Sequence, residues 1–75
     1  MKEDTRRTAR DALRIVARAE KAGMGTGTIC DTLGITPQTI VIWRAVPDRV
    51  PCGRVQRSLA ELDAALREAQ KEGGR

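Results

Sequence analysis

The side chains of this chain that are best suited to chemistry are basic. Arginine and lysine recur at spacings of three and four residues near the N-terminus, which places them along one row of a helix. The row consists of Arg7, Arg10, Arg14, Arg18 and Lys21. Such a row can follow a line of phosphates, and each phosphate that it neutralises releases counterions. The alternative is an ordinary solvated helix face, and the spacing alone does not decide between the two.

Residues typical of catalysis and of metal binding are scarce. The chain has no histidine, the usual general base and a common zinc ligand. Cys30 and Cys52 are too far apart for a metal-binding pair. No secretory segment precedes them, so we expect free thiols in a cytoplasmic protein. The sequence therefore predicts no catalytic residue, no metal and no cofactor.

Length and composition limit the chain to one small domain. It has 75 residues, of which 40% are hydrophobic and 32% charged, and a single tryptophan is its only aromatic residue. Such a chain should fold around a thin aliphatic core and does not resemble a membrane segment. No small-molecule ligand is evident. The net charge of +4 favours an anionic partner.

Three segments must position these side chains, and all three are expected to be helical. Residues 4–22 form a basic helix that ends at Gly23, residues 26–45 form two short helices, and residues 51–71 form a C-terminal helix. In the first helix, Leu13 and Val16 lie on the predicted buried side with Ala9, Ala17 and the stem of Glu20. Ile15 points away from that side, toward a partner or water.

Residues 26–45 carry the strongest pattern. A short helix from Thr26 to Leu33 is ended by Gly34, which tolerates a left-handed backbone. Thr36 is placed as the N-cap of the next helix, with its hydroxyl accepting from an amide two or three residues further on, and Pro37 takes the first helical position. The sequence therefore predicts helix, tight turn, helix.

This run resembles the Cro and repressor type of helix-turn-helix found in phage and bacterial regulators. Cys30 matches the position usually held by a small alanine, and Gly34 matches the turn glycine. The buried positions of the motif are matched by Ile29, Leu33, Ile35, Ile40 and Trp43. The resemblance implies that the second helix enters the major groove of double-stranded DNA.

The second helix offers few groups that can read a base pair. Opposite its buried side lie Gln38, Val41 and Ile42, the candidate base contacts, and only Gln38 can hydrogen-bond a base edge. Candidate phosphate contacts are Thr36, Thr39, Arg44 and Arg49, together with Arg7, Arg10, Arg14 and Arg18 of the first helix. The resembled family more often has polar residues where this chain has Val41 and Ile42. A protein-binding face is therefore a competing interpretation.

The C-terminal helix carries a narrow apolar seam. Its members alternate spacings of four and three, as in coiled coils, and are Val55, Leu59, Leu62, Leu66 and Ala69. The two short helices of residues 26–45 are too short to cover the distal half of this helix. We expect a second copy of the chain to cover it, and packing against the first helix is the alternative.

Together these features predict an all-α bundle of about four helices that contains a helix-turn-helix and dimerises through its C-terminal helix. The expected function is that of a small phage-type or bacterial repressor, which binds a near-palindromic operator as a homodimer in the cytoplasm of a bacterial cell or phage-infected host. One alternative is a helix-turn-helix that binds protein, as an antirepressor or inhibitor. Another is the DNA-binding segment of a recombination or packaging protein.

Overall fold

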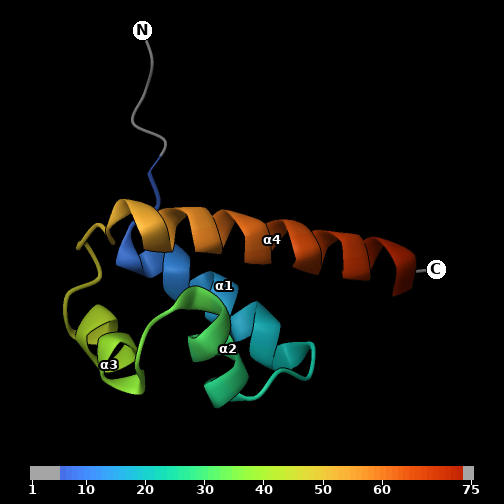
Figure 1. Cartoon of the computed structure of the whole chain (residues 1–75), viewed down its shortest axis with the longest axis horizontal. Helices are drawn as coiled ribbons and strands as arrows, with labels where there is room; N and C mark the ends of the chain where they lie inside the picture. The colour runs from blue at the N-terminus through green and yellow to red at the C-terminus, as the bar shows by residue number, and fades with distance from the viewer. Residues whose placement is uncertain (1–5, 74–75) are drawn as a thin grey trace, which may run out of the picture.

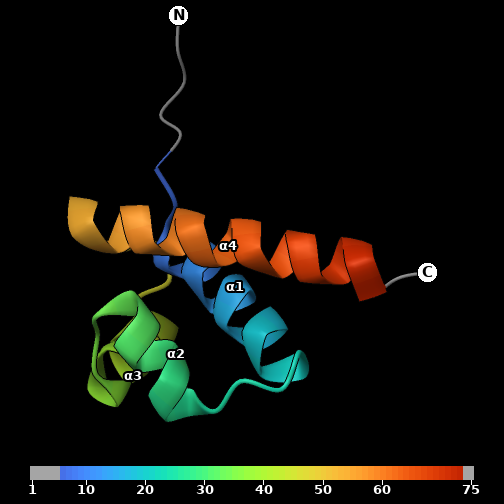
Figure 2. The ribbon, with the colours of Figure 1, turned by 45° about the vertical axis from the view of Figure 1, so that its right-hand side comes forward.

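Four helices build the part of the chain that the computed structural model describes, residues 6–73. They are α1 (Ala9–Lys21), α2 (Thr26–Leu33), α3 (Pro37–Ala45) and α4 (Gly53–Gly73). α4 runs along one side of the molecule and its C-terminal end extends past the other three helices (Figures 1 and 2). α1 and α2 pack against it, and α3 packs against α1 and α2. No strand occurs between residues 6 and 73. The predicted all-α bundle of four helices is confirmed.

α1 begins later than predicted. Asp4 and Thr5 lie outside the described residues, and residues 6–8 precede the helix. Thr8 and Asp11 form a capping box, in which the Asp11 N–H donates to Thr8 Oγ1 (3.4 Å) and the Thr8 N–H donates to Asp11 Oδ2 (3.1 Å). Because this box satisfies backbone donors that have no partner inside the helix, it fixes the first helical residue at Ala9.

The connector between α3 and α4 is fixed to the start of α1. The first two N–H groups of α1, from Ala9 and Arg10, donate to the carbonyl oxygens of Arg49 (2.6 Å) and Pro47 (3.0 Å). These bonds satisfy two further helix-end donors. They also hold the end of α3 beside the beginning of the chain's first helix, so the position of α3 does not depend on core packing alone.

α4 spans Gly53–Gly73, two residues later at each end than the predicted 51–71. Gln56 in its first turn is hydrogen-bonded to the backbone on both sides. Its Nε2 donates to Arg7 O (2.7 Å) and to Pro51 O (3.2 Å), and its Oε1 accepts from the Arg7 N–H (2.8 Å). The side-chain amide thereby ties the start of α4 to the segment that leads into α1.

All four helices contribute to one hydrophobic core. Its buried members are Ala9, Ala12, Ile15, Val16, Ala19, Ile29, Cys30, Leu33, Ile40, Trp43, Val55, Leu59, Leu62 and Leu66. The prediction for the buried side of α1 is partly wrong, because Ile15 is buried whereas Ala17 and Glu20 are exposed. Ala12 and Ala19 are fully buried. Since Ile15 is buried as well, the side of α1 that faces the core is the one that carries these three residues.

The apolar seam of α4 is buried within the chain itself. Val55, Leu59, Leu62 and Leu66 are each 9% exposed or less, and they share the core with residues of α1 and α2. Ala69 is exposed. The expectation that this seam needs a second copy to cover it is wrong, because α1 directs Ile15 into the same core. These four side chains do not form an exposed dimerisation surface.

Candidate functional site

α2 and α3 form a helix-turn-helix with a three-residue turn, residues 34–36. Gly34 has a left-handed backbone, with φ of 71°, and its N–H donates to Asp31 O (3.3 Å). The next N–H, from Ile35, donates to Cys30 O (2.9 Å). This pattern closes the end of α2 and redirects the chain into α3. The predicted turn glycine is confirmed, and the two short helices lie next to each other in both views (Figures 1 and 2).

The motif is anchored by the side chains that the sequence placed in its core. Ile29, Cys30, Leu33, Ile40 and Trp43 are buried, and Ile35 is half-buried against the same core. Trp43, with 2% exposure, is the largest of these side chains. Because Trp43 and Ile40 fix one side of α3, the opposite side must face outward.

Thr36 is the N-cap of α3, although its hydroxyl does not act as predicted. The backbone of Thr36 is extended, and its carbonyl accepts from the Thr39 N–H (2.9 Å). Its side chain makes no capping bond. Instead Thr36 Oγ1 lies 3.3 Å from Thr39 Oγ1, and either hydroxyl can donate to the other. Two hydroxyl groups are therefore paired at the N-terminal end of α3, and each can make further hydrogen bonds.

The outward face of α3 is largely apolar. At about 100° per residue, Gln38, Val41, Ile42 and Ala45 lie opposite the buried side, and all four are exposed. Val41 is 54% exposed and Ile42 38% exposed, so only Gln38 offers a polar side chain on this face. After the helix, Val46 and Val50 are also exposed.

Two arginines border this face without an ion-pair partner among residues 6–73. Arg44 lies in the last turn of α3 and Arg49 in the connector, and both are exposed. Arg10 of α1 reaches the same connector, since its Nη2 is 3.4 Å from Asp48 Oδ1. The structure thus brings three of the predicted phosphate contacts, Arg10, Arg44 and Arg49, to the neighbourhood of the connector.

The basic row of α1 divides into two groups. Arg7 and Arg18 point to α4 and bind Asp63, at 3.4 Å and 2.7 Å. Arg14 is 73% exposed and lies only 3.9 Å from Asp11, too far for a hydrogen bond. Arg10 and Arg14 are therefore better placed than Arg7 and Arg18 to meet a phosphate.

Asp63 is the buried charge that the sequence does not reveal. Its side chain is 8% exposed and contacts three guanidinium groups, those of Arg7, Arg18 and Arg67. The hydrogen bond from Arg18, and the positive charges of Arg67, Arg18 and Arg7, outweigh the effect of burial and lower the pKa of Asp63 below its ordinary value. Arg67 lies four residues after Asp63 on the same helix, a spacing that brings the two side chains together at 3.3 Å. The other two partners come from the far end of the chain.

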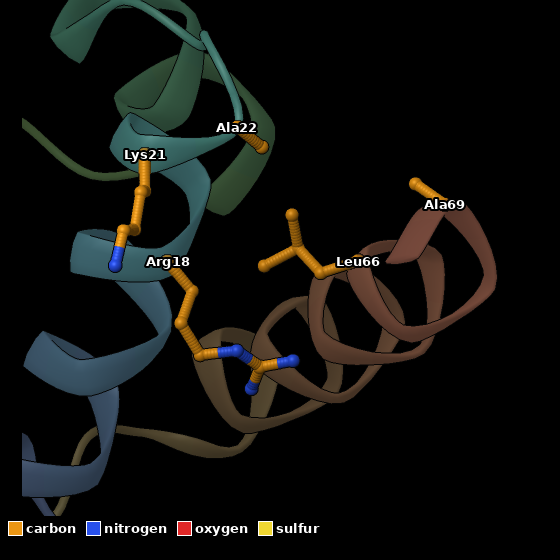
Figure 3. Close-up of a pocket in the computed structure, with 5 residues that line it drawn as sticks. All are labelled: Arg18, Lys21, Ala22, Leu66 and Ala69. Atoms are coloured by element: carbon orange, nitrogen blue, oxygen red, sulfur yellow. The ribbon is translucent and has the colours of Figure 1, made fainter. Parts of the chain in front are cut away.

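A cavity of about 370 Å³ opens where α1 ends while α4 continues. It is lined by Arg18, Lys21, Ala22, Leu66 and Ala69. In Figure 3, Leu66 points from α4 toward α1, and Arg18 extends from α1 toward α4. Arg18 is already bound to Asp63 and is not free to bind a ligand there. The cavity lies where α4 extends past the end of α1.

The two cysteines differ in their surroundings, which predicts different reactivity. Cys52 is exposed just before α4, where N–H groups of Val55 and Arg54 bond its sulfur and lower the pKa of its thiol. Cys30 is buried. With a disulfide reagent at neutral pH we expect one thiol per folded chain, that of Cys52, to react, and the second to react only after denaturation. The rate of the Cys52 reaction should rise at a lower pH than it does for an unperturbed cysteine. The Cys52→Ser variant should be inert while folded; rapid labelling of that variant would contradict the assignment.

Comparison with known protein families, with curated proteins and with solved structures found no match for this chain. Among residues 6–73 there is no cluster of three or more histidine, cysteine or acidic side chains able to hold a metal ion. No helix in that range is long and apolar enough to cross a membrane. The geometry of α2, α3 and the connector is therefore the basis for a function.

Proposed function

We propose that this chain binds double-stranded DNA through α3 and acts as a small repressor-type regulator. The observation that carries the proposal is the geometry of α2, the Gly34 turn and α3, which leaves the outward face of α3 free. A helix presented in this way fits the major groove. The paired threonine hydroxyls at its start, with Arg49 in the hollow that they line, and Arg44 in its last turn supply donors for phosphates.

The rest of the proposal concerns assembly and location. Regulators of this type read near-palindromic sites as homodimers, with recognition helices about 34 Å apart. The seam of α4 is buried within the chain, so the two copies would meet at another surface. A cytoplasmic location, in a bacterial cell or phage-infected host, accords with a DNA target.

Salt dependence of binding to a pool of random duplexes tests the proposal. If Arg10, Arg14, Arg44 and Arg49 each neutralise one phosphate, the logarithm of the affinity should fall with the logarithm of salt with a slope of about −3.6. Between about 50 and about 200 mM salt this is a loss of roughly 100-fold. Fluorescence anisotropy of labelled duplexes measures it directly. Absence of binding at the lowest salt would refute the proposed function.

Charge-matched variants show whether the predicted surface makes the contacts. In Arg44→Gln the slope of the logarithm of affinity against the logarithm of salt should be less negative by about one, because the substitution removes one phosphate contact. Lys21→Gln removes the same charge at the far end of α1, beside the cavity of Figure 3, and should leave the slope unchanged. Equal effects of the two variants would mean that net charge alone drives the binding.

A protein partner is the second candidate for the same face. The observation that favours it is the exposure of the neighbouring side chains of Val41 and Ile42 on one face of α3, since exposed apolar surface is typical of interaction sites. Binding that rises with salt, or is insensitive to it, distinguishes such an apolar contact from the proposed contact with DNA.

A further inference from the structure

The outward face of α3 offers methyl groups where a base-reading helix commonly offers hydrogen bonds. Its members are Gln38, Val41, Ile42 and Ala45, all exposed, and only the first is polar. Thr39 is half-buried and paired with Thr36, and Arg44 lies on the flank of the helix. Whatever α3 meets in a groove is therefore met mainly through aliphatic carbon.

Base pairs present one apolar group in the major groove, the methyl group on C5 of thymine. Cytosine, adenine and guanine carry none, and their edges are hydrogen-bond donors and acceptors that an aliphatic side chain would leave without a partner. We propose that Val41 and Ile42 make α3 a reader of pyrimidine C5 methyl groups, with Gln38 as its single hydrogen-bonding contact to a base. This inference rests on the proposed binding to DNA.

The surroundings of this face favour DNA over a protein partner. Arg44 lies in the last turn of α3, and Arg49 lines the same hollow as Thr36 and Thr39. Neither arginine has an ion pair among the described residues, whereas Arg10 is paired with Asp48 of the connector. Hydroxyl groups of Thr36 and Thr39 stand at the start of the helix. An apolar strip flanked by cations and hydroxyls matches a groove floor of methyl groups between two phosphate backbones. The net charge of +4 acts in the same direction.

Replacement of thymine by uracil isolates the methyl group, because the two bases share every hydrogen-bonding group. A binding site is first selected from a random duplex library and then synthesised in three forms, with thymine, with uracil, and with 5-bromouracil, whose bromine has nearly the size of a methyl group. Burial of one methyl group contributes about a four-fold gain in affinity. We expect uracil to weaken binding by about that factor for each methyl contacted, and 5-bromouracil to restore it.

Variants of the protein assign the effect to α3. In the double variant Val41→Ala and Ile42→Ala, affinities for the thymine and uracil duplexes should converge, because the side chains that touch the methyl groups are gone. Val50→Ala is the matched control, since Val50 is also exposed (41%) but lies in the connector, and it should retain the preference for thymine. Circular dichroism of all variants confirms that they are folded.

The possible results separate this inference from the proposed function. Tight, salt-dependent binding with equal affinity for thymine and uracil would overturn methyl reading and leave DNA binding intact. A thymine preference that survives in the double variant would overturn the assignment to Val41 and Ile42. No binding to any duplex at low salt would overturn both proposals, and the apolar face would then belong to a protein partner.

Discussion

Trp43→Ala should remove much of the stability of this chain. Trp43 is 2% exposed and is the largest fully buried side chain, in a core otherwise made of aliphatic residues and one cysteine. Truncating a buried tryptophan costs about 3–5 kcal/mol, from lost burial and from the cavity left behind. A domain of 75 residues has a free energy of unfolding of only about 4–11 kcal/mol. We therefore expect the melting temperature to fall by roughly 15–30 °C.

Far-UV circular dichroism is the appropriate measurement, because the substitution also removes the chain's only tryptophan fluorophore. Val41→Ala is the control on the same helix. That side chain is 54% exposed, and its truncation should change the free energy of unfolding by no more than about 0.5 kcal/mol. If the free energy of unfolding of Trp43→Ala is within about 1 kcal/mol of that of the wild type, then Trp43 does not anchor α3. The outward direction of Val41 and Ile42 then loses its main support.

The helix-turn-helix could be predicted because its determinants are local. Gly34 is needed where the backbone becomes left-handed, and Pro37 suits the first turn of a helix whatever surrounds it. Burial of Ile40 and Trp43 then follows from their spacing alone. The start of α1 is also determined locally, by the capping box of Thr8 and Asp11. The prediction missed it because the helical pattern was extended upstream to residue 4.

The orientation of α1 and the covering of α4 could not be predicted in the same way. Apolar residues cover about half of the circumference of α1, with Ile15 at one edge of that arc and Ala17 at the other. Periodicity does not say which edge is buried, and only packing against other helices selects the one with Ile15. The same choice decides whether the seam of α4 is covered within the chain. Asp63 is harder still, because its partners Arg18 and Arg7 are 45 and 56 residues away in the sequence. Nothing local distinguishes it from a solvated aspartate.

Asp63→Asn should be the most destabilising change of a charged side chain in the described part of the molecule. The substitution preserves shape and removes the charge that joins Arg7, Arg18 and Arg67. Breaking a buried charge network costs up to about 5 kcal/mol, but these arginines are 30%, 39% and 73% exposed and can be rehydrated. We expect a loss of about 2–3 kcal/mol in chemical denaturation at neutral pH. Asp48→Asn breaks an exposed pair with Arg10 and should cost at most about 1 kcal/mol.

The pH dependence of this loss distinguishes the charge of Asp63 from its packing. The pKa of Asp63 is lowered in the folded chain, whereas in the unfolded chain it should lie near its ordinary value of about 3.9. Unfolding therefore takes up a proton at pH values between the two, and the contribution of Asp63 is complete above the unfolded pKa and decreases as pH falls through the folded pKa. The wild type should accordingly lose stability below about pH 4, and its advantage over Asp63→Asn should narrow on acidification. An advantage that stays constant across this range would mean that Asp63 stabilises the fold through shape and neutral hydrogen bonds, and that the three arginines gain nothing from its charge.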